Sequence, residues 1–190
     1  MDQLISAMGK KDHAMLLDCQ SLTFDHSTLP DDLHIVIINS NVKRGLVDSE
    51  YNLRRQQCEQ AASLLGVPSL REATLERLEA AKPAMPEVVY RRARHIITEN
   101  ARTHAMFDAL KQSDIATVSE AMAASHASMR DDFEITVPPI DYLVELISGL
   151  LAKDGGVRMT GGGFGGCVVA LVPKQRIEDV KALVNQNYFK

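Results

Sequence analysis

The sequence predicts an α+β fold in which helices pack over an antiparallel sheet. Two observations carry this prediction. Segments typical of strands lie near both ends of the 190-residue chain, and amphipathic helical patterns fill its middle. No internal repeat, low-complexity tract or clear linker divides the sequence. We therefore treat residues 1–190 as a single domain.

The chain begins with a helical pattern and two strand patterns. Residues 2–9 predict a short helical turn ending at Gly9, because glycine favours the C-terminal cap of a helix. Residues 13–19 read as a strand. Residues 33–39 predict a stronger strand, because three Ile and one Val in this segment favour a pleated, buried surface.

The middle of the chain predicts helices whose ends carry known signals. Asp48 and Ser49 are typical N-caps, Gly66 is a typical stop, and Pro86 suits a first helical position. A strand is predicted at residues 167–172. The predicted helices cover residues 49–65, 69–81, 86–111, 114–129, 138–153 and a last segment that begins at Pro173.

Composition argues against several classes of protein. A net charge of −4 and a pI near 5.9 argue against a nucleic-acid-binding domain. The three cysteines form no Cys-x-x-Cys pair, and neither cysteines nor histidines show zinc-ligand spacing, so we expect reduced thiols in the cytoplasm. The apolar runs are too short to span a membrane, and the N-terminal charges are placed wrongly for a signal peptide.

The segment from residue 155 to residue 167 contains seven of the eleven glycines in the chain. Glycine loses the most backbone entropy on folding, so this density indicates sharp bends or a close approach by another group. Successive exposed amides in such a loop can form an anion-binding concavity. The alternative interpretation is a tight connection between two strands, but five glycines within residues 161–166 favour the functional one.

Two other nucleotide-binding motifs do not fit this loop. Gly161, Gly163 and Gly166 formally satisfy the G-x-G-x-x-G pattern of dinucleotide-binding folds. That fingerprint requires a helix after the loop, whereas an apolar strand pattern follows here. A Walker A loop is excluded because no Gly-Lys-Ser/Thr sequence closes the segment.

Four segments, in the same order along the chain, resemble segments of the GHMP kinases. Their amino-acid sequences resemble the galactokinase branch in particular. The run at 158–167 (RMTGGGFGGC) is similar to the third conserved motif of that family. The segments at 1–6, 49–58 and 125–133 are similar to the stretch with the catalytic aspartate, the helix with a sugar-binding tyrosine, and a further family stretch. The resemblance implies the ferredoxin-like C-terminal domain of these kinases.

The resemblance also implies the roles of individual residues. Asp2 is the expected catalytic base, or the carboxylate that orients the attacking sugar hydroxyl. Tyr51 is the expected sugar contact, through its ring and its hydroxyl. No metal ligand is assigned. The loop expected to line the site comprises Thr160, Gly161, Gly162, Gly163, Phe164, Gly165 and Gly166.

Taken as a whole, the resemblance implies a kinase that uses ATP and Mg²⁺ to phosphorylate the anomeric hydroxyl of galactose. The sugar-binding signature and the Gly-Leu-Ser-Ser-Ser phosphate segment of the family do not occur in these 190 residues. We therefore expect a C-terminal half that binds no cofactor and is inactive alone, and that self-associates through apolar surface. Two alternatives stay open: a non-catalytic sugar sensor related to galactokinase, and a plain folding unit.

Two further clusters of charged residues invite interpretation. His126, Asp131 and Asp132 suggest a catalytic or metal site, but a helix end with local ion pairs to Arg130 is the simpler interpretation. The basic run at residues 91–95 is most simply a solvated helical face.

Overall fold

Antiparallel strand pairing organises the fold, which is given by a computed structural model that describes residues 2–43 and 47–189, without the side chains of Asp2, Val47 and Asp48. Strands β1 (His13–Leu17) and β2 (Phe24–Thr28) form a two-stranded sheet. Strands β3 (Leu33–Asn39), β4 (Gly156–Thr160) and β5 (Cys167–Pro173) form a second sheet in the order β3-β5-β4. The predicted α+β class is confirmed, with the strands divided between two sheets.

The predicted helices are present with small changes at their ends. Helix α2 begins at Val47, so Asp48 and Ser49 lie inside it instead of capping it. The segment predicted as a helix at 69–81 divides into a short 3-10 turn and a separate α-helix. The helices are α1 (Asp2–Met8), α2 (Val47–Leu65), α3 (Leu75–Ala81), α4 (Glu87–Lys111), α5 (Ile115–Asp131), α6 (Pro138–Leu151) and α7 (Ile177–Asn187), with 3-10 turns at Leu70–Glu72, Lys82–Ala84 and Lys174–Arg176.

Two strands were not predicted, for different reasons. Strand β2 has the sequence FDHST, which is too polar to give a strand signal, and it forms by pairing with β1. Strand β4 begins at Gly156 within the segment interpreted as loop. A side chain at Gly156 would collide with Met122, because a Cβ atom there would lie 2.6 Å from the Met122 sulfur. This glycine therefore lets α5 pack closely on the sheet.

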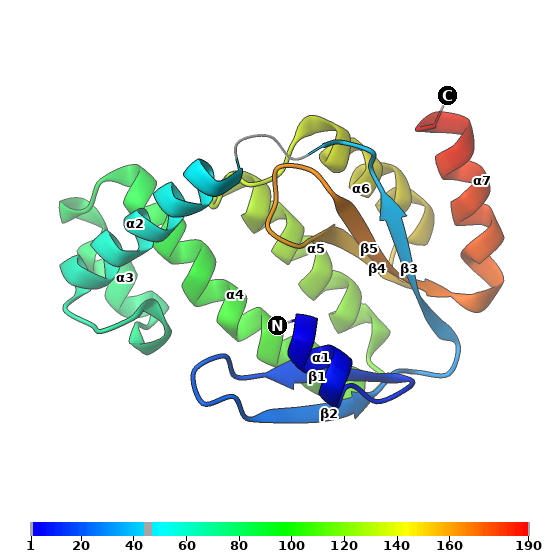
Figure 1. Ribbon diagram of the computed structural model, residues 1–190, viewed down its shortest axis with the longest axis horizontal. Helices are drawn as coiled ribbons and strands as arrows, with labels where there is room; N and C mark the ends of the chain where they lie inside the picture. The colour runs from blue at the N-terminus through cyan, green and yellow to red at the C-terminus, as the bar shows by residue number, and fades with distance from the viewer. Residues whose placement is uncertain (1, 44–46, 190) are drawn as a thin grey trace.

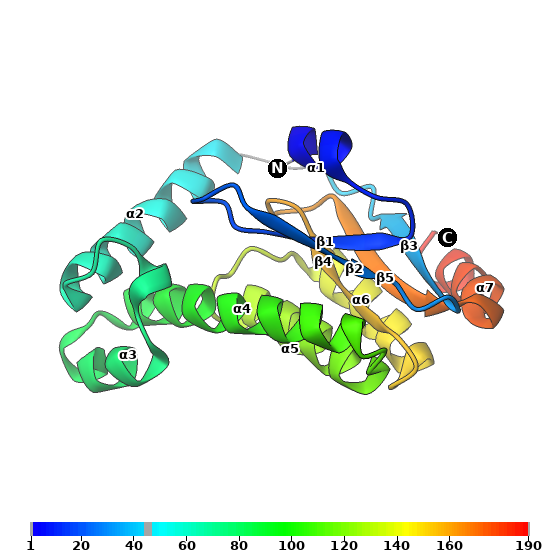
Figure 2. The same cartoon turned by 90° about the horizontal axis from the view of Figure 1, so that it is seen from below.

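Three hydrophobic clusters hold the layers together. One face of the three-stranded sheet, including Val168 and Met159, packs against α6 and α7. The opposite face, represented by Leu171, packs against α4 and α5. A third cluster around Leu78 joins α2, α3 and α4. Figures 1 and 2 show α2 and α3 at one end of the molecule and α7 at the other, joined by the long helix α4 and its neighbour α5.

Strand β3 exposes apolar side chains at the edge of its sheet. Ile35 is 52% exposed and Ile37 is 67% exposed. Both belong to an edge strand, because β3 pairs only with β5 within the described part of the chain. Over the same residues, no helix is long and apolar enough to cross a membrane.

Candidate active site at the glycine loop

The glycine-rich segment forms the turn between two antiparallel neighbours, β4 and β5, whose last ladder pair is Thr160 with Cys167. Most of its backbone adopts left-handed conformations that glycine tolerates and other residues rarely adopt. Phe164 adopts such a conformation without being glycine, with a φ of 59°. The positive φ angles of the glycines are 82° at Gly161, 87° at Gly163, 125° at Gly165 and 91° at Gly166.

Two of these glycines lie against backbone from other parts of the chain. A Cβ atom at Gly163 would lie 2.6 Å from the carbonyl oxygen of Ile135, and one at Gly165 would lie 2.7 Å from that of Val42. The loop also bonds to both segments. The Phe164 amide donates to the Ile135 oxygen at 2.7 Å, and the Gly166 amide donates to the Val42 oxygen at 3.3 Å. The loop is therefore held in place by main-chain contacts on two sides.

The remaining loop amides have a different environment. Among the described residues, no backbone oxygen accepts a hydrogen bond from the amides of Gly161, Gly162, Gly163 or Gly165. Gly161 and Gly162 are exposed, and nothing lies within 4 Å of a Cβ atom placed at Gly162. Exposed amides in a fixed, sharply bent backbone are the donors that bind phosphate and other anions. Whether these amides bind an anion stays a prediction.

Further contacts anchor the base of the loop. The amide and hydroxyl of Ser40 both donate to the carbonyl oxygen of Gly166, at 2.9 and 2.6 Å. The Tyr188 hydroxyl in turn donates to the Ser40 carbonyl oxygen at 2.8 Å. These bonds tie the loop to the end of β3 and to the C-terminal end of α7.

Arg54 joins helix α2 to the loop. Its guanidinium lies 5.8 Å from the centre of the Phe164 ring. It also donates to the carbonyl oxygens of Phe133 at 2.7 Å and Glu134 at 2.8 Å, just before Ile135. Only 9% of the Arg54 side chain is exposed, so these bonds are shielded from water. Figures 1 and 2 show the beginning of α2 beside the glycine loop.

Arg54 belongs to a larger cluster that we call the arginine junction. Arg92 is buried, donates to the Asp132 carbonyl oxygen, and pairs with the Glu134 carboxylate at 2.5 Å. The hydrogen bond from Arg92 holds the pKa of Glu134 below its ordinary value. The junction comprises Arg54, Arg91, Arg92 and Arg94, the carboxylates of Asp132 and Glu134, and the backbone oxygens of residues 131–134.

Comparison with known proteins identifies the family. Residues 106–190 match the family described as GHMP kinases C terminal. The structure is similar to that of Lactococcus lactis galactokinase complexed with galactose, with 33% sequence identity and a TM-score of 0.88, over 98% of this chain. The chain carries a GHMP kinase C-terminal domain. It spans about half the length of that galactokinase, covering 49% of it.

A second GHMP kinase shares the fold at much lower identity. The mevalonate kinase of L. major, solved in complex with R-mevalonate, matches 92% of this chain with 14% identity and a TM-score of 0.59. This chain covers 45% of that protein. At such identity the likeness shows a common GHMP kinase fold and nothing about substrate.

The two residues predicted to contact substrate belong to helices α1 and α2. Tyr51 is on α2, three residues before Arg54, and its side chain is 62% exposed. Asp2 is the first residue of α1, and its side chain lies outside the described residues. In both views the N-terminal end of α1 is turned toward the beginning of α2 and the glycine loop (Figures 1 and 2). The predicted roles of Asp2, Tyr51 and the loop stay predictions.

The three residues that suggested a metal or catalytic site do not converge. The Nδ1 atom of His126 accepts from the Met159 amide at 3.3 Å, and its Nε2 atom lies 3.2 Å from Asp141. Asp132 is buried and pairs with Arg94. Asp131 is exposed and pairs with Arg130 at 2.8 Å, as the simpler interpretation predicted. The described residues contain no group of three or more His, Cys, Asp or Glu side chains that could hold a metal ion.

The interpretation of residues 91–95 as a solvated helical face was wrong. Arg92 and His95 are 2% and 6% exposed, and Ala93 is fully buried. Burial lowers the pKa of His95 to about 4. The Nδ1 atom of His95 forms a hydrogen bond with the Ser128 hydroxyl at 2.9 Å, and the His95 ring stacks on Phe133. Arg92 can be buried because the Asp132 carbonyl oxygen and the Glu134 carboxylate accept hydrogen bonds from its guanidinium group.

Sequence reasoning therefore missed the support of the site. Arg54 lies inside the segment 49–58 that carried the resemblance, but nothing in that segment distinguishes it from its neighbour Arg55. Arg55 instead pairs with Glu59 on the exposed surface of the same helix. The glycines of the loop were the one sequence signal for a close approach by other backbone. They do not indicate that residues 42 and 135 make this approach, because those residues are distant in sequence.

Proposed function

We propose that this chain forms one side of the active site of a galactokinase, which transfers phosphate from ATP to the anomeric hydroxyl of galactose. The observation that carries the proposal is the glycine loop, an anchored turn beside the helix that bears Tyr51. Its exposed amides have no backbone partner within the part of the chain that the structure describes. The likeness to a galactokinase solved with galactose, over nearly the whole chain, supports this choice of substrate.

The chemistry assigns a distinct role to each part. The galactose hydroxyl oxygen attacks the γ-phosphorus of ATP, its proton passes to Asp2, and the bond to the departing ADP oxygen breaks. Phosphoryl transfer depends mainly on positioning and on stabilising negative charge. Amides of Gly161 and Gly162 would donate to phosphate oxygens, and the Tyr51 ring and hydroxyl would orient the sugar.

The described residues contain no group of three or more His, Cys, Asp or Glu side chains to which Mg²⁺ can be assigned. ATP-dependent kinases use Mg²⁺ to neutralise phosphate charge. Its ligands would include the phosphate oxygens of ATP.

A hybrid enzyme tests the proposal. In it, this chain replaces the matching half of the Lactococcus lactis galactokinase, and ADP release is coupled to a spectrophotometric assay. We expect galactose-dependent turnover that falls at least about a hundredfold in Asp2→Asn, because general-base catalysis contributes factors of that order. Tyr51→Phe should raise KM for galactose by roughly tenfold through the lost hydrogen bond.

Exposed Arg55 offers a matched control on the same helix, since Arg55→Gln should leave the turnover rate and the KM for galactose within about twofold. A folded hybrid that phosphorylates galactose equally well with Asn at position 2 would refute the assigned role of Asp2. The purified 190-residue chain alone should show no galactose-dependent ATP consumption, because the family's phosphate segment does not occur in it.

We also propose that the isolated chain self-associates through the edge strand β3. The exposed Ile35 and Ile37 support this, since apolar side chains on an unpaired strand edge favour pairing with another chain. Light scattering should report a dimer or larger species that Ile37→Lys returns toward the monomer. A monomer at high concentration in the unmodified chain contradicts the idea.

A further inference from the structure

A pocket lies between the sheet and the helices, away from the glycine loop. Its walls come from strand β1, from Leu29 just after β2, from the strands β3, β4 and β5, and from the helices α4 and α5. None of the loop glycines lines it. Arg158 does line it, although this residue begins the segment that resembles the third family motif. The site proposed above therefore leaves Arg158 without a role.

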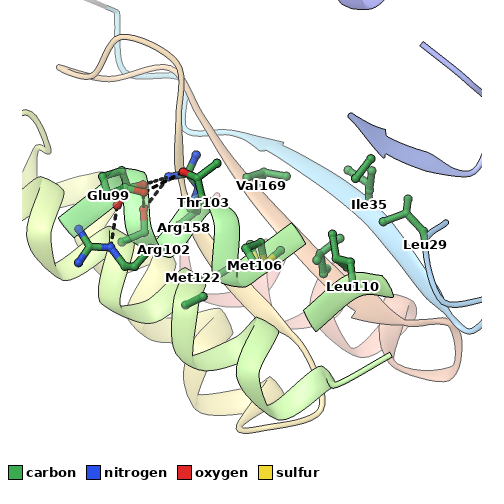
Figure 3. A pocket seen from close by; sticks show the side chains of 14 residues that line it. Leu29, Ile35, Glu99, Arg102, Thr103, Met106, Leu110, Met122, Arg158 and Val169 are labelled. Carbon is green, nitrogen blue, oxygen red and sulfur yellow. Dashed lines mark hydrogen bonds and ion pairs between the residues drawn. The ribbon is translucent and has the colours of Figure 1, made fainter. Parts of the chain in front are cut away.

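The pocket has a polar end and an apolar end. Figure 3 shows Glu99, Arg102 and Arg158 gathered at one end, with Leu29, Ile35 and Leu110 at the other. The middle includes the flexible side chains of Met106 and Met122, and methionine adapts its shape to a ligand more readily than branched residues do. A water molecule in the apolar part would find few hydrogen-bond partners.

At the polar end both oxygens of the carboxylate accept hydrogen bonds, whereas the two arginines do not use all their donors toward the described residues. One oxygen of Glu99 accepts from Ser125 at 2.5 Å and from Arg158 at 3.1 Å, and the other accepts from Arg102 at 2.8 Å. Burial opposes the charge on Glu99, but these hydrogen bonds and the two arginines outweigh it and hold its pKa below the ordinary value. The acceptor is thus occupied on both of its oxygens.

The arginines, in contrast, have donors left over. Within the described part of the chain, Arg158 uses only its Nη1 atom, which donates to Glu99 and to Ser125. The Nη2 atom of Arg102 is buried and has no hydrogen-bond partner among the described residues. Two guanidinium groups against one carboxylate leave an excess of one positive charge. An anionic group that accepts two hydrogen bonds suits this end, as a carboxylate does.

We propose that this pocket binds a medium-chain aliphatic carboxylate, with the carboxylate on Arg158 and the chain along Met106 and Leu110. The size of the ligand follows from the pocket volume of about 260 Å³. This volume is roughly that of nine liquid waters, which matches a ligand of about ten non-hydrogen atoms. Octanoate has this size and serves as the probe.

Nuclear magnetic resonance of the 190-residue chain tests the proposal directly. With ¹³C-methyl methionine labelling, sodium octanoate should shift the signals of Met106 and Met122 in a saturable way. The signal of Met85 should stay in place, because Met85 is buried in the separate cluster of α2, α3 and α4. 1-Octanol, with the same chain and no charge, should bind at least about tenfold more weakly.

Variants of Arg158 separate the charge from the cavity. Arg158→Gln should weaken octanoate binding about tenfold or more and change octanol binding less than threefold. Arg158→Lys, which keeps the charge, should bind octanoate more tightly than Arg158→Gln. Arg130→Gln removes an exposed arginine outside this pocket and should change neither. The unshifted Met85 signal reports that each variant is folded.

Three results would overturn the proposal. The first is an absence of saturable shifts at Met106 and Met122. The second is equal affinity for octanol and octanoate, which would make the pocket a merely apolar cavity. The third is unchanged octanoate binding in a folded Arg158→Gln variant, which would remove the guanidinium from the site.

Discussion

The glycine loop and the arginine junction meet at residues 134 and 135, yet they fix their geometry in opposite ways. The loop uses backbone: two of its amides donate to the carbonyl oxygens of Ile135 and Val42, and others have no backbone partner among the described residues. The junction uses side chains: guanidinium groups donate hydrogen bonds to the carbonyl oxygens of residues 131–134. The junction is a support in which guanidinium groups pair with carbonyl oxygens and carboxylates, whereas the loop has exposed amides without a backbone partner among the described residues.

The largest expected effect comes from breaking the junction at Arg92. Its side chain is 3% exposed and reaches Glu134, Gln57 and the Asp132 carbonyl oxygen. Arg92→Leu should lower the free energy of unfolding by about 3 kcal/mol, because buried acceptors lose their donor. Urea denaturation measures this, with Arg55→Leu on the surface as the control expected within about 0.5 kcal/mol. A loss below about 1 kcal/mol at Arg92 would contradict the role of the junction.

The second effect sharpens the comparison inside the loop itself. Gly163→Ala should cost about 2 to 3 kcal/mol, because φ is 87° and the added Cβ atom would lie 2.6 Å from the Ile135 oxygen. Gly162→Ala is the matched control, since nothing lies within 4 Å of its Cβ position. The free energy of unfolding of Gly162→Ala should stay within about 0.5 kcal/mol of that of the unmodified chain. If Gly163→Ala and Gly162→Ala lower stability equally in thermal or urea unfolding, the close approach of the Ile135 oxygen does not require glycine at position 163.

A smaller effect concerns pH and the buried His95 behind the junction. Burial lowers its pKa from the ordinary 6.5 to about 4, so below pH 6.5 the unfolded chain binds a proton that the folded chain excludes. Stability should therefore be complete above pH 6.5 and fall by about 1 to 2 kcal/mol between pH 7 and pH 5. His126, whose pKa burial also lowers, contributes in the same direction.

Substitution isolates the share of His95. In His95→Gln the fall in stability between pH 7 and pH 5, followed by urea unfolding at each pH, should be visibly smaller. The exposed His104 is the control, and His104→Gln should leave the slope unchanged. An unaltered slope in His95→Gln would assign the pH dependence elsewhere.

The sequence predicted most of the fold because its signals are local. The strand at residues 33–39 is present with those bounds, and the ends of α4 and α6 lie within two residues of prediction. What failed depends on distant partners. Strand β2 exists through pairing with β1, and Gly156 begins a strand because α5 packs on it.

The same distinction applies to the site. The glycine loop was found because an unusual composition is visible in a sequence, although whether it binds phosphate stays a prediction. Arg92 and His95 were misplaced on the surface, since arginine and histidine are usually exposed and only the carbonyl oxygens brought to them by the fold explain their burial. Arg158 was assigned to the loop, whereas it lies in β4 and lines a separate pocket.

Amide hydrogen exchange of the 190-residue chain, resolved by residue, tests most directly whether the loop keeps donors for a ligand. The amides of Phe164 and Gly166 should exchange at least about tenfold more slowly, relative to their intrinsic rates, than those of Gly161 and Gly162. Equal protection of all four amides would show that the exposed donors already have partners, and the loop would then have none to offer a phosphate.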